Sequence, residues 1–240
     1  QNVSLKMKLD PNKLYFLPLG GSGEIGMNLN LYHYRGKWLM VDLGVTFDQT
    51  PGIEVLMPDT QFIEEHAQNL VGIVLTHAHE DHIGAIPYVE KEINLPIYAT
   101  KLTMGIIENK IKEHNLIKTT KRKVVKHGQI INLGCFRIEF IRTNHSIADS
   151  AGLAIYTPAG IIIHTGDFKI DYTPVFGEVM DLPRFAELGK KGVLALMADS
   201  TNVERPGFTM SERTVGKTFD NLFADNRENR IIVATFASNV

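Results

Sequence analysis

The 240-residue sequence predicts an α/β protein in which β-sheets pack on each other and helices cover the outside. Three observations lead to this fold class. Most apolar runs are short, rich in β-branched residues and bounded by Gly, Pro or Asn, as strands are. Stretches with helical periodicity separate only some of these runs, which disfavours a strictly alternating parallel sheet. The hydrophobic content of 44% and the charged content of 22% are those of an ordinary globular chain.

The first half of the chain contains most of one expected sheet. An apolar run at Leu14–Leu19 ends in glycines, and Arg35-Gly36 is the predicted turn of a hairpin. A helix is expected at Ile83–Ile93, broken early by Pro87. Strands are expected at Asn28–Tyr34, Lys37–Val41, Gly72–Thr76 and Pro96–Ala99, and a further helix at Thr103–His114.

The second half again contains short predicted strands, and after residue 203 the pattern changes to a linker and a helix. Strands are expected at Ile130–Leu133, Phe136–Arg142, Gly152–Tyr156, Gly160–His164 and Val193–Ala198. After the linker-like segment 204–207, the Thr-x-x-Glu spacing at Thr209 predicts a capped helix to about Ala224. A strand is expected at Ile231–Phe236. We therefore expect one domain over residues 1–206 and the beginning of a second, incomplete in this chain, over residues 207–240.

Composition and charge exclude several classes of protein. The net charge of −2 gives bulk electrostatics no preferred partner, so a nucleic-acid binder would need a local basic strip. The single cysteine, Cys135, excludes a disulfide within the chain and is expected to be a small buried hydrophobe. The N-terminus has no apolar segment, and no run approaches the roughly 18 residues needed to span a bilayer. A cytoplasmic protein without membrane association is expected.

The candidate for chemistry is a cluster of ionisable residues directly after the predicted strand Gly72–Thr76. Three imidazoles and a carboxylate fall within six residues, at His77, His79, Asp81 and His82. Imidazole nitrogen and carboxylate oxygen are the usual ligands of zinc and similar divalent ions. His77 and His79 alternate with Ala78, so an extended backbone directs both to one side, whereas Asp81 and His82 can face a second ion.

Two other motifs do not meet the requirements of their chemistry. A metalloprotease helix requires His-Glu-x-x-His, but Ile83 occupies the position of the second histidine after His79-Glu80. Gly21–Gly26 matches Gly-x-Gly-x-x-Gly, with Asp42 about 20 residues on, as a dinucleotide site would have. That motif should open a helix, but the residues after Asn28 alternate like a strand. We expect this glycine loop instead to let the backbone pass close to the metal site.

Further polar residues lie where predicted strands end. His145 follows Phe136–Arg142, and Asp167 follows Gly160–His164. Asp42 and Asp199 end strands in the same way, and either could orient a ligand histidine by a hydrogen bond to the ring nitrogen that does not bind the metal. Functional residues often sit where a rigid strand gives way to a loop.

Together these motifs resemble a known family. His-x-His-x-Asp-His at residues 77–82, then a lone histidine, then Thr-Gly-Asp, each after a strand, are similar to the metallo-β-lactamase superfamily. Three flanking stretches resemble its β-CASP branch and, within that, the bacterial ribonucleases of the J type. They are Gly20–Asn28, Asp199–Asn202 and Ala234–Asn239. The resemblance runs from about Leu14 to Val240, and the flanking stretches are its more specific part.

The resemblance implies a four-layer αββα sandwich with the metals at one edge, followed by the start of a β-CASP domain. Two divalent ions are implied, with zinc the first choice and manganese or magnesium as alternatives. His77, His79 and His145 would hold one ion, Asp81 and His82 the other, and Asp167 would bridge them. Asp42 would support the cluster; Asp81, Asp167 and Asp199 would act in catalysis, with Asp199 at the rim. The family takes a further histidine for its second ion from a later segment, which this chain does not contain.

The function implied is hydrolysis of RNA phosphodiester bonds by a hydroxide that the two metals activate. RNA would be cut internally and also degraded from the 5′ end, in RNA processing and decay. RNA would be the partner, and the complete protein would form a homo-oligomer, a dimer or tetramer. Two alternatives stay open: a thioester or lactone hydrolase of the same superfamily, which would share every ligand, and a non-catalytic RNA-binding protein. The helix and strand expected after Arg205 favour the nuclease, because a small hydrolase needs no new domain there.

Two groups of residues are ambiguous. The basic stretch between Lys110 and Lys126 is either a solvated face or a phosphate contact. It comprises Lys110, Lys112, Lys118, Lys121, Arg122, Lys123 and Lys126. Five further histidines fit no ligand pattern and are expected at the surface or in packing: His33, His66, His114, His127 and His164.

Overall fold

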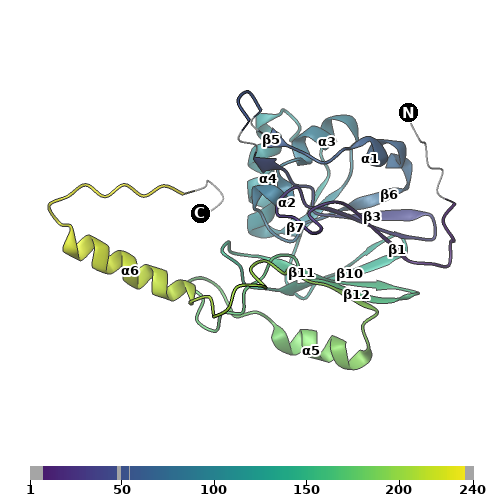
Figure 1. The fold of residues 1–240 in the computed structure, drawn as a ribbon. Helices are drawn as coiled ribbons and strands as arrows, with labels where there is room; N and C mark the ends of the chain where they lie inside the picture. Colours follow the sequence, from purple (N-terminus) through teal and green to yellow (C-terminus); the bar gives the residue numbers. More distant parts are fainter. Residues whose placement is uncertain (1–7, 48–49, 54, 236–240) are drawn as a thin grey trace.

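Two β-sheets lie face to face in the computed structural model, which describes residues 8–47, 50–53 and 55–235 (Figure 1). The first sheet contains, in spatial order, β1 (Tyr15–Gly20), β2 (Leu29–Tyr34), β3 (Lys37–Val41), β6 (Leu70–Val74), β7 (Ile97–Thr100) and β8 (Arg122–Val125). The second contains β13 (Ala195–Met197), β12 (Gly160–His164), β11 (Ala151–Thr157), β10 (Phe136–Arg142) and β9 (Ile130–Leu133). Both sheets are mixed: β6 runs parallel to β3 and β7, whereas β10 is antiparallel to both of its neighbours.

Helices cover the outer faces of both sheets. The first sheet carries α1 (Gln61–Glu65), the 3₁₀ turn Ala67–Asn69, α2 (Glu80–Ile83), α3 (Ile86–Glu92) and α4 (Lys101–Glu113). The second sheet carries α5 (Leu182–Lys191), on the far side of the sandwich in Figure 1. A small hairpin, β4 (Thr46–Phe47) and β5 (Val55–Leu56), lies beside the first sheet. The predicted four-layer αββα sandwich is confirmed.

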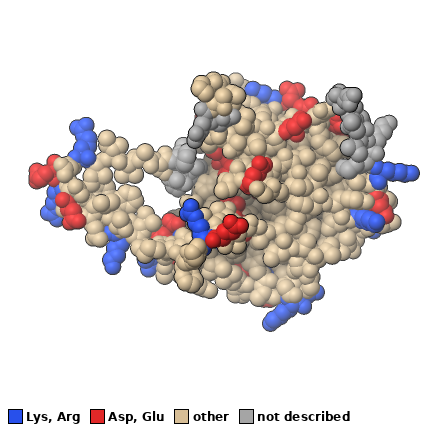
Figure 2. Space-filling view, viewed as in Figure 1, with Lys and Arg blue, Asp and Glu red and all other residues tan. Residues whose placement is uncertain are grey.

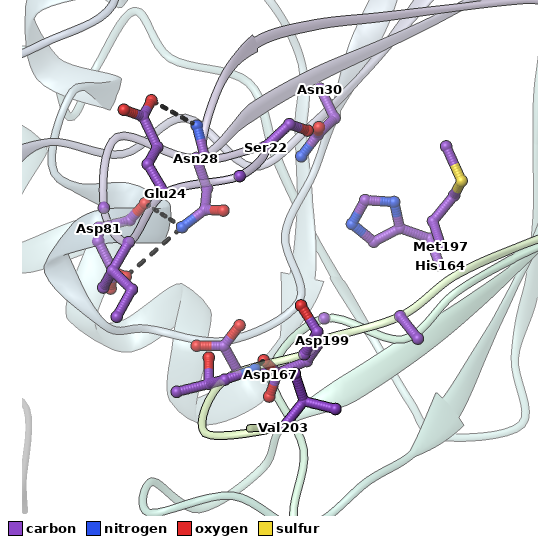
Figure 3. A pocket seen from close by; sticks show the side chains of 18 of the residues that line it. Ser22, Glu24, Asn28, Asn30, Asp81, His164, Asp167, Met197, Asp199 and Val203 are labelled. Carbon is purple, nitrogen blue, oxygen red and sulfur yellow. Dashed lines mark hydrogen bonds between the residues drawn. The ribbon is translucent and has the colours of Figure 1, made fainter. Parts of the chain in front are cut away.

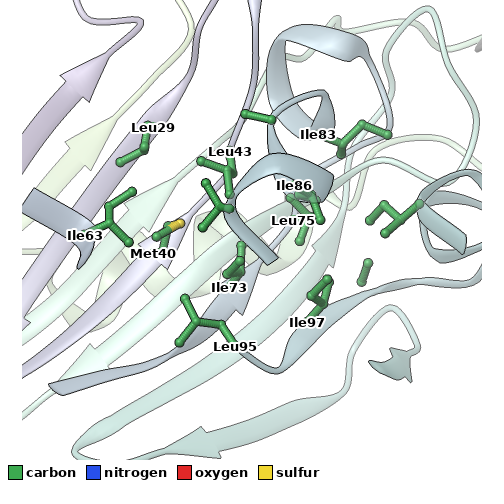
Figure 4. Packing of buried hydrophobic residues seen from close by; sticks show 14 of the residues in the cluster. Leu29, Met40, Leu43, Ile63, Ile73, Leu75, Ile83, Ile86, Leu95 and Ile97 are labelled. Atoms are coloured by element: carbon green, nitrogen blue, oxygen red, sulfur yellow. The ribbon is translucent and has the colours of Figure 1, made fainter. Parts of the chain in front are cut away.

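Side chains alternate between the two faces of the sheet along β2 and β3, so these strands contribute to two hydrophobic cores. Leu29 and Leu31 point toward the helices, where they join the apolar cluster drawn in Figure 4. Tyr32 and Tyr34 belong to the cluster between the two sheets, together with Phe140 of β10. Successive strand residues face opposite sides, so a nearly continuous apolar run is required where both sides are buried. Arg35-Gly36, with positive φ at both residues, forms the predicted hairpin turn between these strands.

Several predicted elements differ from the structure. The helix expected at Ile83–Ile93 is shorter in the structure: α3 spans Ile86–Glu92, and Ile83 is the last residue of the separate helix α2. Pro87 lies in the first turn of α3, where a missing N–H costs no helical hydrogen bond, so it starts a helix and does not break one. β8 and α5 were not predicted, because short basic and proline-containing segments carry weak periodicity.

Residues after Arg205 leave the sandwich. α6 (Glu212–Asp225) extends away from it in Figure 1. Its N-cap is Ser211, which accepts from the backbone N–H of Arg213, and not the predicted Thr209. The strand predicted at Ile231–Phe236 is wrong over residues 231–235, because within the described chain no neighbouring strand pairs with them. Phe236, and with it most of the Ala234–Asn239 motif, lies outside the described residues.

Candidate metal centre

The candidate ligands meet at one edge of the sandwich, and both sheets contribute. His77 and His79 follow the carboxyl end of β6, and His82 lies in the short helix α2 directly after them. His145 follows β10 of the second sheet, and Asp167 follows β12. Residues separated by as many as 90 positions in the sequence are therefore brought together by the packing of one sheet on the other.

One group consists of His77, His79 and His145. One nitrogen of each lies within 4.8 Å of the other two, and His145 Nε2 is 3.1 Å from His79 Nδ1. Zinc bound tetrahedrally at about 2.1 Å requires ligand atoms about 3.4 Å apart. The three imidazoles therefore approach the spacing of a zinc site from three sides.

A second group shares a residue with the first. His77, His82 and Asp167 offer ligand atoms within the same 4.8 Å limit. Asp167 Oδ2 lies 3.4 Å from His82 Nε2, 3.7 Å from His145 Nε2 and 3.9 Å from His77 Nε2. Asp81 Oδ2 lies 3.6 Å from His82 Nε2. The carboxylate of Asp167 thus stands between the two groups, where a bridging ligand would have to be.

A hydrogen-bond relay fixes the protonation of His77. Thr76 Oγ1 donates to Asp42 Oδ2 at 2.9 Å, so its oxygen accepts from His77 Nδ1 at 3.0 Å. The proton of the neutral ring is therefore on Nδ1, and Nε2 carries a lone pair. That Nε2 atom is fully buried and has no hydrogen-bond partner among the described residues. Such an orphaned acceptor is costly unless something binds it, and a divalent cation fits its chemistry.

Asp42 orients the second histidine as well. Its buried carboxylate accepts from His82 Nδ1 at 2.7 Å and from the Thr76 backbone N–H at 2.9 Å. Asp42 also adopts a positive φ of 63°, unusual for a residue other than glycine. The predicted supporting position of Asp42 matches this geometry. Thr76 was not singled out from the sequence, because a threonine before a histidine carries no distinctive pattern.

The candidate ligand histidines differ in the direction in which the site shifts their pKa values. Burial, and then the charges of His82, His145 and His79, hold the pKa of His77 well below its usual value. Burial likewise lowers the pKa of His79, and that of His145 to about 4. These three rings are neutral at pH 7, the form that binds metal.

His82 differs from the other three. Burial alone would lower its pKa, but the charge of Asp42 and hydrogen bonds to Asp167 and Asp42 raise it well above the usual value. Burial raises the pKa of Asp81. In Asp167, burial is outweighed by the hydrogen bond and charge of His82, so its pKa is lowered. An ion on the His82 side must therefore displace a proton from His82 Nε2.

Asp199 lies apart from the ligand groups. Its Oδ2 accepts from the backbone N–H of Phe168 at 3.4 Å, and its Oδ1 accepts from the backbone N–H of Thr201 at 2.8 Å. Its own N–H donates to Thr165 Oγ1 at 3.1 Å. Asp199 therefore holds the loop that carries Asp167, at the rim of the site.

Two glycines allow the backbones around the site to pass closely. A Cβ on Gly44 would fall 1.6 Å from the carbonyl oxygen of Asp81. Gly166 has a φ of +60°, and a Cβ there would fall 2.8 Å from Cβ of Thr76. The Gly21–Gly26 loop was expected to let the backbone pass close to the metal site. In the structure it does not begin a helix, and it lines a pocket together with Asp81.

This pocket has a volume of about 770 Å³ and opens beside the candidate metal ligands (Figure 3). Its walls are the Gly21–Gly26 loop on one side and the segment 196–205 on the other. Asn28, whose role the sequence did not reveal, donates to the Asp81 carbonyl at 3.2 Å and lies 3.1 Å from His82 Nε2.

The remaining histidines contact protein groups. His33 packs on Trp38, His66 stacks on Phe62, and His114 meets Tyr88 edge-on. His127 Nε2 lies 3.0 Å from the Ser150 carbonyl. These contacts confirm the packing prediction; His164 is buried as well, but it lines the pocket.

Cys135 and the basic stretch give mixed outcomes. Cys135 is half-buried and not fully buried, and its Sγ donates to the Tyr34 carbonyl.

In the basic stretch, Lys110 pairs with Glu80 and Arg122 pairs with Glu108. On the face seen in Figure 2, lysine and arginine lie around the rim and on α6, without a continuous basic patch over the sandwich. The phosphate-contact role of the stretch stays a prediction.

No helix in the described ranges is long and apolar enough to cross a membrane.

Comparison with known proteins identifies the family of the chain. The family model described as the metallo-beta-lactamase superfamily matches residues 28–185. Ribonuclease J of Synechocystis is 45% identical over 231 residues, 95% of this chain and 36% of that protein. Ribonuclease J of Helicobacter pylori is 44% identical over 243 residues, 100% of this chain and 35% of that protein. Ribonuclease J of Sinorhizobium meliloti is 44% identical over 234 residues, 95% of this chain and 41% of that protein.

A solved structure supports the fold. A protein of unknown function from Enterococcus faecalis superposes with a TM-score of 0.67 at 17% identity, covering 93% of this chain and 60% of that one. The chain spans between about a third and two fifths of the length of the three curated relatives. On the family match, the sandwich and the ligand cluster, the chain belongs to the metallo-β-lactamase superfamily and is ribonuclease J-like.

Proposed function

We propose that this chain carries most of the active site of a metal-dependent ribonuclease that hydrolyses RNA phosphodiester bonds with two divalent ions. Zinc is the proposed metal, with manganese or magnesium as alternatives. His77, His79 and His145 would hold one ion, Asp81 and His82 the other, and Asp167 would bridge them. The observation that carries the proposal is the buried, unpartnered Nε2 of His77, which belongs to both ligand groups within the described chain.

When bound, the ions would supply an activated water near neutral pH and neutralise charge on the phosphate oxygens. The protein's own contribution is preorganisation. Asp42 and Thr76 hold His77 and His82 in one orientation, so no reorganisation is needed when the substrate binds. Asp199 would keep the Asp167 loop in place at the rim.

RNA is the proposed substrate because the similar proteins are named ribonucleases, which favours it over a thioester or lactone. The pocket beside the ligands, about 770 Å³, is large enough for a nucleotide unit. Both internal cleavage and degradation from the 5′ end are proposed, in RNA processing and decay in the cytoplasm, by a homo-oligomer of the complete protein.

We also propose that residues 1–206 form the metallo-β-lactamase domain and that residues 207–240 begin a β-CASP domain. In support, α6 presents an apolar side that the sandwich does not cover: Val215, Phe219, Leu222 and Phe223 are all exposed. An uncovered apolar patch of this kind marks a surface that another structural unit contacts. The second ion should bind more weakly than the first, because, of this chain's residues, only Asp81, His82 and the shared Asp167 would hold it, and RNA cleavage by the chain should be slow.

The test combines zinc titration of the 240-residue chain with cleavage of an end-labelled RNA oligonucleotide. We expect one ion to bind tightly and a second weakly, and cleavage to require zinc. Replacing both His77 and His79 by alanine should abolish tight binding and cleavage together, because two of the three nitrogens around one ion are lost.

His114→Ala is the matched control, since His114 packs on Tyr88 and belongs to neither ligand group. It should bind zinc and cleave RNA like the wild type. A wild-type chain that folds but binds no divalent ion would exclude the proposed centre. Two equally tight ions with rapid cleavage would instead show that the site needs nothing more than this chain.

A further inference from the structure

His145 is the one member of the candidate ligand group His77, His79 and His145 that the second sheet supplies. It lies in the loop of residues 143–150, between β10 and β11. Its Nε2 is 3.1 Å from Nδ1 of His79, which follows β6 of the first sheet. The geometry of this group therefore depends on how the loop is held against the first sheet.

The base of the loop is closed by hydrogen bonds between its two ends. The Thr143 N–H donates to the Ser150 carbonyl at 3.2 Å, and Ser150 Oγ donates to the Thr143 carbonyl at 3.0 Å. The Ala151 N–H donates to the carbonyl of Thr76, directly before the histidine cluster, at 2.8 Å. These bonds fix only the ends, so the position of His145 within the loop requires further contacts.

Asp149 supplies such a contact, at the start of α4. Its Oδ2 accepts from the Leu102 backbone N–H at 2.9 Å, and its carbonyl accepts from Thr100 Oγ1 at 2.7 Å. Thr100 is the N-cap of α4, but within the described chain its side chain makes no capping bond to the helix. The first N–H groups of a helix lack intrahelical acceptors, and a carboxylate there also interacts favourably with the helix dipole. Asp149 therefore caps α4 from 47 positions away in the sequence.

The backbone and the neighbours of Asp149 agree with this docking. Asp149 has a φ of 65°, a conformation that aspartate adopts more readily than most residues do. Ile147, two residues earlier, is buried in the apolar cluster between the first sheet and its helices. His127 Nε2 lies 3.0 Å from the Ser150 carbonyl. A loop that belongs to the second sheet is thus seated on elements of the first.

The same helix contacts the segment that carries the other candidate ligands. Lys110 of α4 forms an ion pair with Glu80, which lies between His79 and Asp81. A 13-residue helix is about 20 Å long and behaves as one stiff element. One end of α4 therefore holds the His145 loop, and a later turn contacts the segment with the histidine cluster.

We propose that Asp149 is a positioning residue for His145: its carboxylate docks the loop on α4 and so places the imidazole beside His77 and His79. The proposal rests on the proposed function for the identity of what the three imidazoles hold, a divalent ion. Asp149 acts through the loop and not on the ion itself. Loss of the docking bond should release His145 but leave both sheets in place, because Thr143 and Ser150 still close the loop.

The test compares Asp149→Gly with Asp149→Asn. Glycine removes the acceptor but suits a positive φ, so this variant loses the docking bond without backbone strain. Asparagine tolerates the same φ and keeps an oxygen that can accept from Leu102. Residues that orient a metal ligand typically change metal affinity 10- to 100-fold. Because Asp149 acts through a loop, Asp149→Gly should weaken zinc binding about tenfold in a chelator competition, and Asp149→Asn should stay within about twofold.

The ¹⁵N spectrum of the histidines gives a readout that a general loss of stability would not change. In the zinc-loaded wild type and in Asp149→Asn, His145 Nε2 should show the shift of a metal-bound nitrogen. In Asp149→Gly, part of the His145 signal should be that of a free imidazole, while His79 stays bound. In metal-free protein, the amides of residues 145–148 should exchange faster in Asp149→Gly than in the wild type.

Asp59→Gly is the matched control. Asp59 also accepts from a backbone N–H at the start of a helix, that of Gln61 in α1, but its loop carries no candidate ligand. This variant should keep its zinc affinity. If Asp149→Gly does not fold, Thr100→Val decides, since it removes the second docking bond and no capping bond of α4. Its zinc affinity should be a fewfold lower than that of the wild type, and an unchanged affinity would overturn the positioning role.

The outcomes separate the positioning role from the proposed function. Unchanged zinc affinity and a fully bound His145 in Asp149→Gly would overturn the positioning role and leave the ribonuclease proposal standing. An equal loss in Asp149→Asn would overturn it as well, because the asparagine oxygen still accepts from Leu102. Zinc binding that depends on Asp149 as expected, in a chain that cleaves no RNA, would support the positioning role and remove the ribonuclease.

Discussion

Asp42→Asn should change the protonation of two candidate metal-binding histidines without changing the shape of the site. The wild-type carboxylate accepts three hydrogen bonds, from the Thr76 backbone, Thr76 Oγ1 and His82 Nδ1. An asparagine oxygen can keep the backbone bond, but its NH₂ group then faces two donors. Thr76 Oγ1 must turn to accept from the new amide, and its own proton then points at His77 Nδ1. His77 is left with its proton on Nε2, where a metal would bind.

The magnitude follows from the contacts. Loss of one residue that orients a metal ligand typically costs 10- to 100-fold in metal affinity, roughly 1.4–2.8 kcal/mol. Asp42 orients both His77 and His82, so we expect the upper end of this range, about 100-fold. In metal-free protein the change also breaks the buried pair between Asp42 and His82, at a cost on the order of 3–5 kcal/mol of stability.

Zinc affinity can be measured by competition with a chromophoric chelator, and the histidine tautomers by ¹⁵N NMR in the presence of EDTA. Asp59→Asn is the control, because Asp59 accepts only from Gln61 at the start of α1 among the described residues. Unchanged zinc affinity in Asp42→Asn, or a His77 proton that remains on Nδ1, would refute the relay through Thr76.

Three further predictions concern stability and backbone geometry. Burial raises the pKa of Glu90 to about 8, so the folded state keeps a proton that the unfolded state loses above its ordinary value of 4.5. The free energy of unfolding of the wild type should therefore fall as pH rises from about 4.5 to 8. In urea unfolding, Glu90→Gln should be more stable than the wild type by a few kcal/mol at pH 8 but not at pH 4.5. An equal difference in stability at the two pH values would contradict this. Gly166→Ala should lower zinc affinity because its Cβ meets Thr76, whereas Gly177→Ala, also at positive φ but in open space, should not. Phe140→Ala should cost about 3–5 kcal/mol in the core between the sheets, measured by the same unfolding assay, and a loss under about 1 kcal/mol would contradict that burial.

The sequence by itself predicted most of the strands and the candidate ligands. β2 and β3 were predictable because the residues of β2 alternate as those of a strand do, and because the two runs meet at Arg35-Gly36, a hairpin turn in which both residues have positive φ. His77, His79 and His82 were predictable because three imidazoles within six residues are costly to hold together without a cation to bind. His145 and Asp167 each lie in a loop after a strand, and the family resemblance connected them to the cluster.

Long-range contacts were decided only by the tertiary structure. Thr76 could not be identified as the relay, because its role depends on Asp42, 34 positions earlier, reaching its hydroxyl. The division of α2 from α3 followed from Pro87, which can break a helix or start one, and only the packing of neighbouring segments decides between these. His164 shows the same limit. The sequence assigned it to packing, but burying its Nδ1 against Tyr32, 132 positions away, is what leaves the other nitrogen facing the pocket.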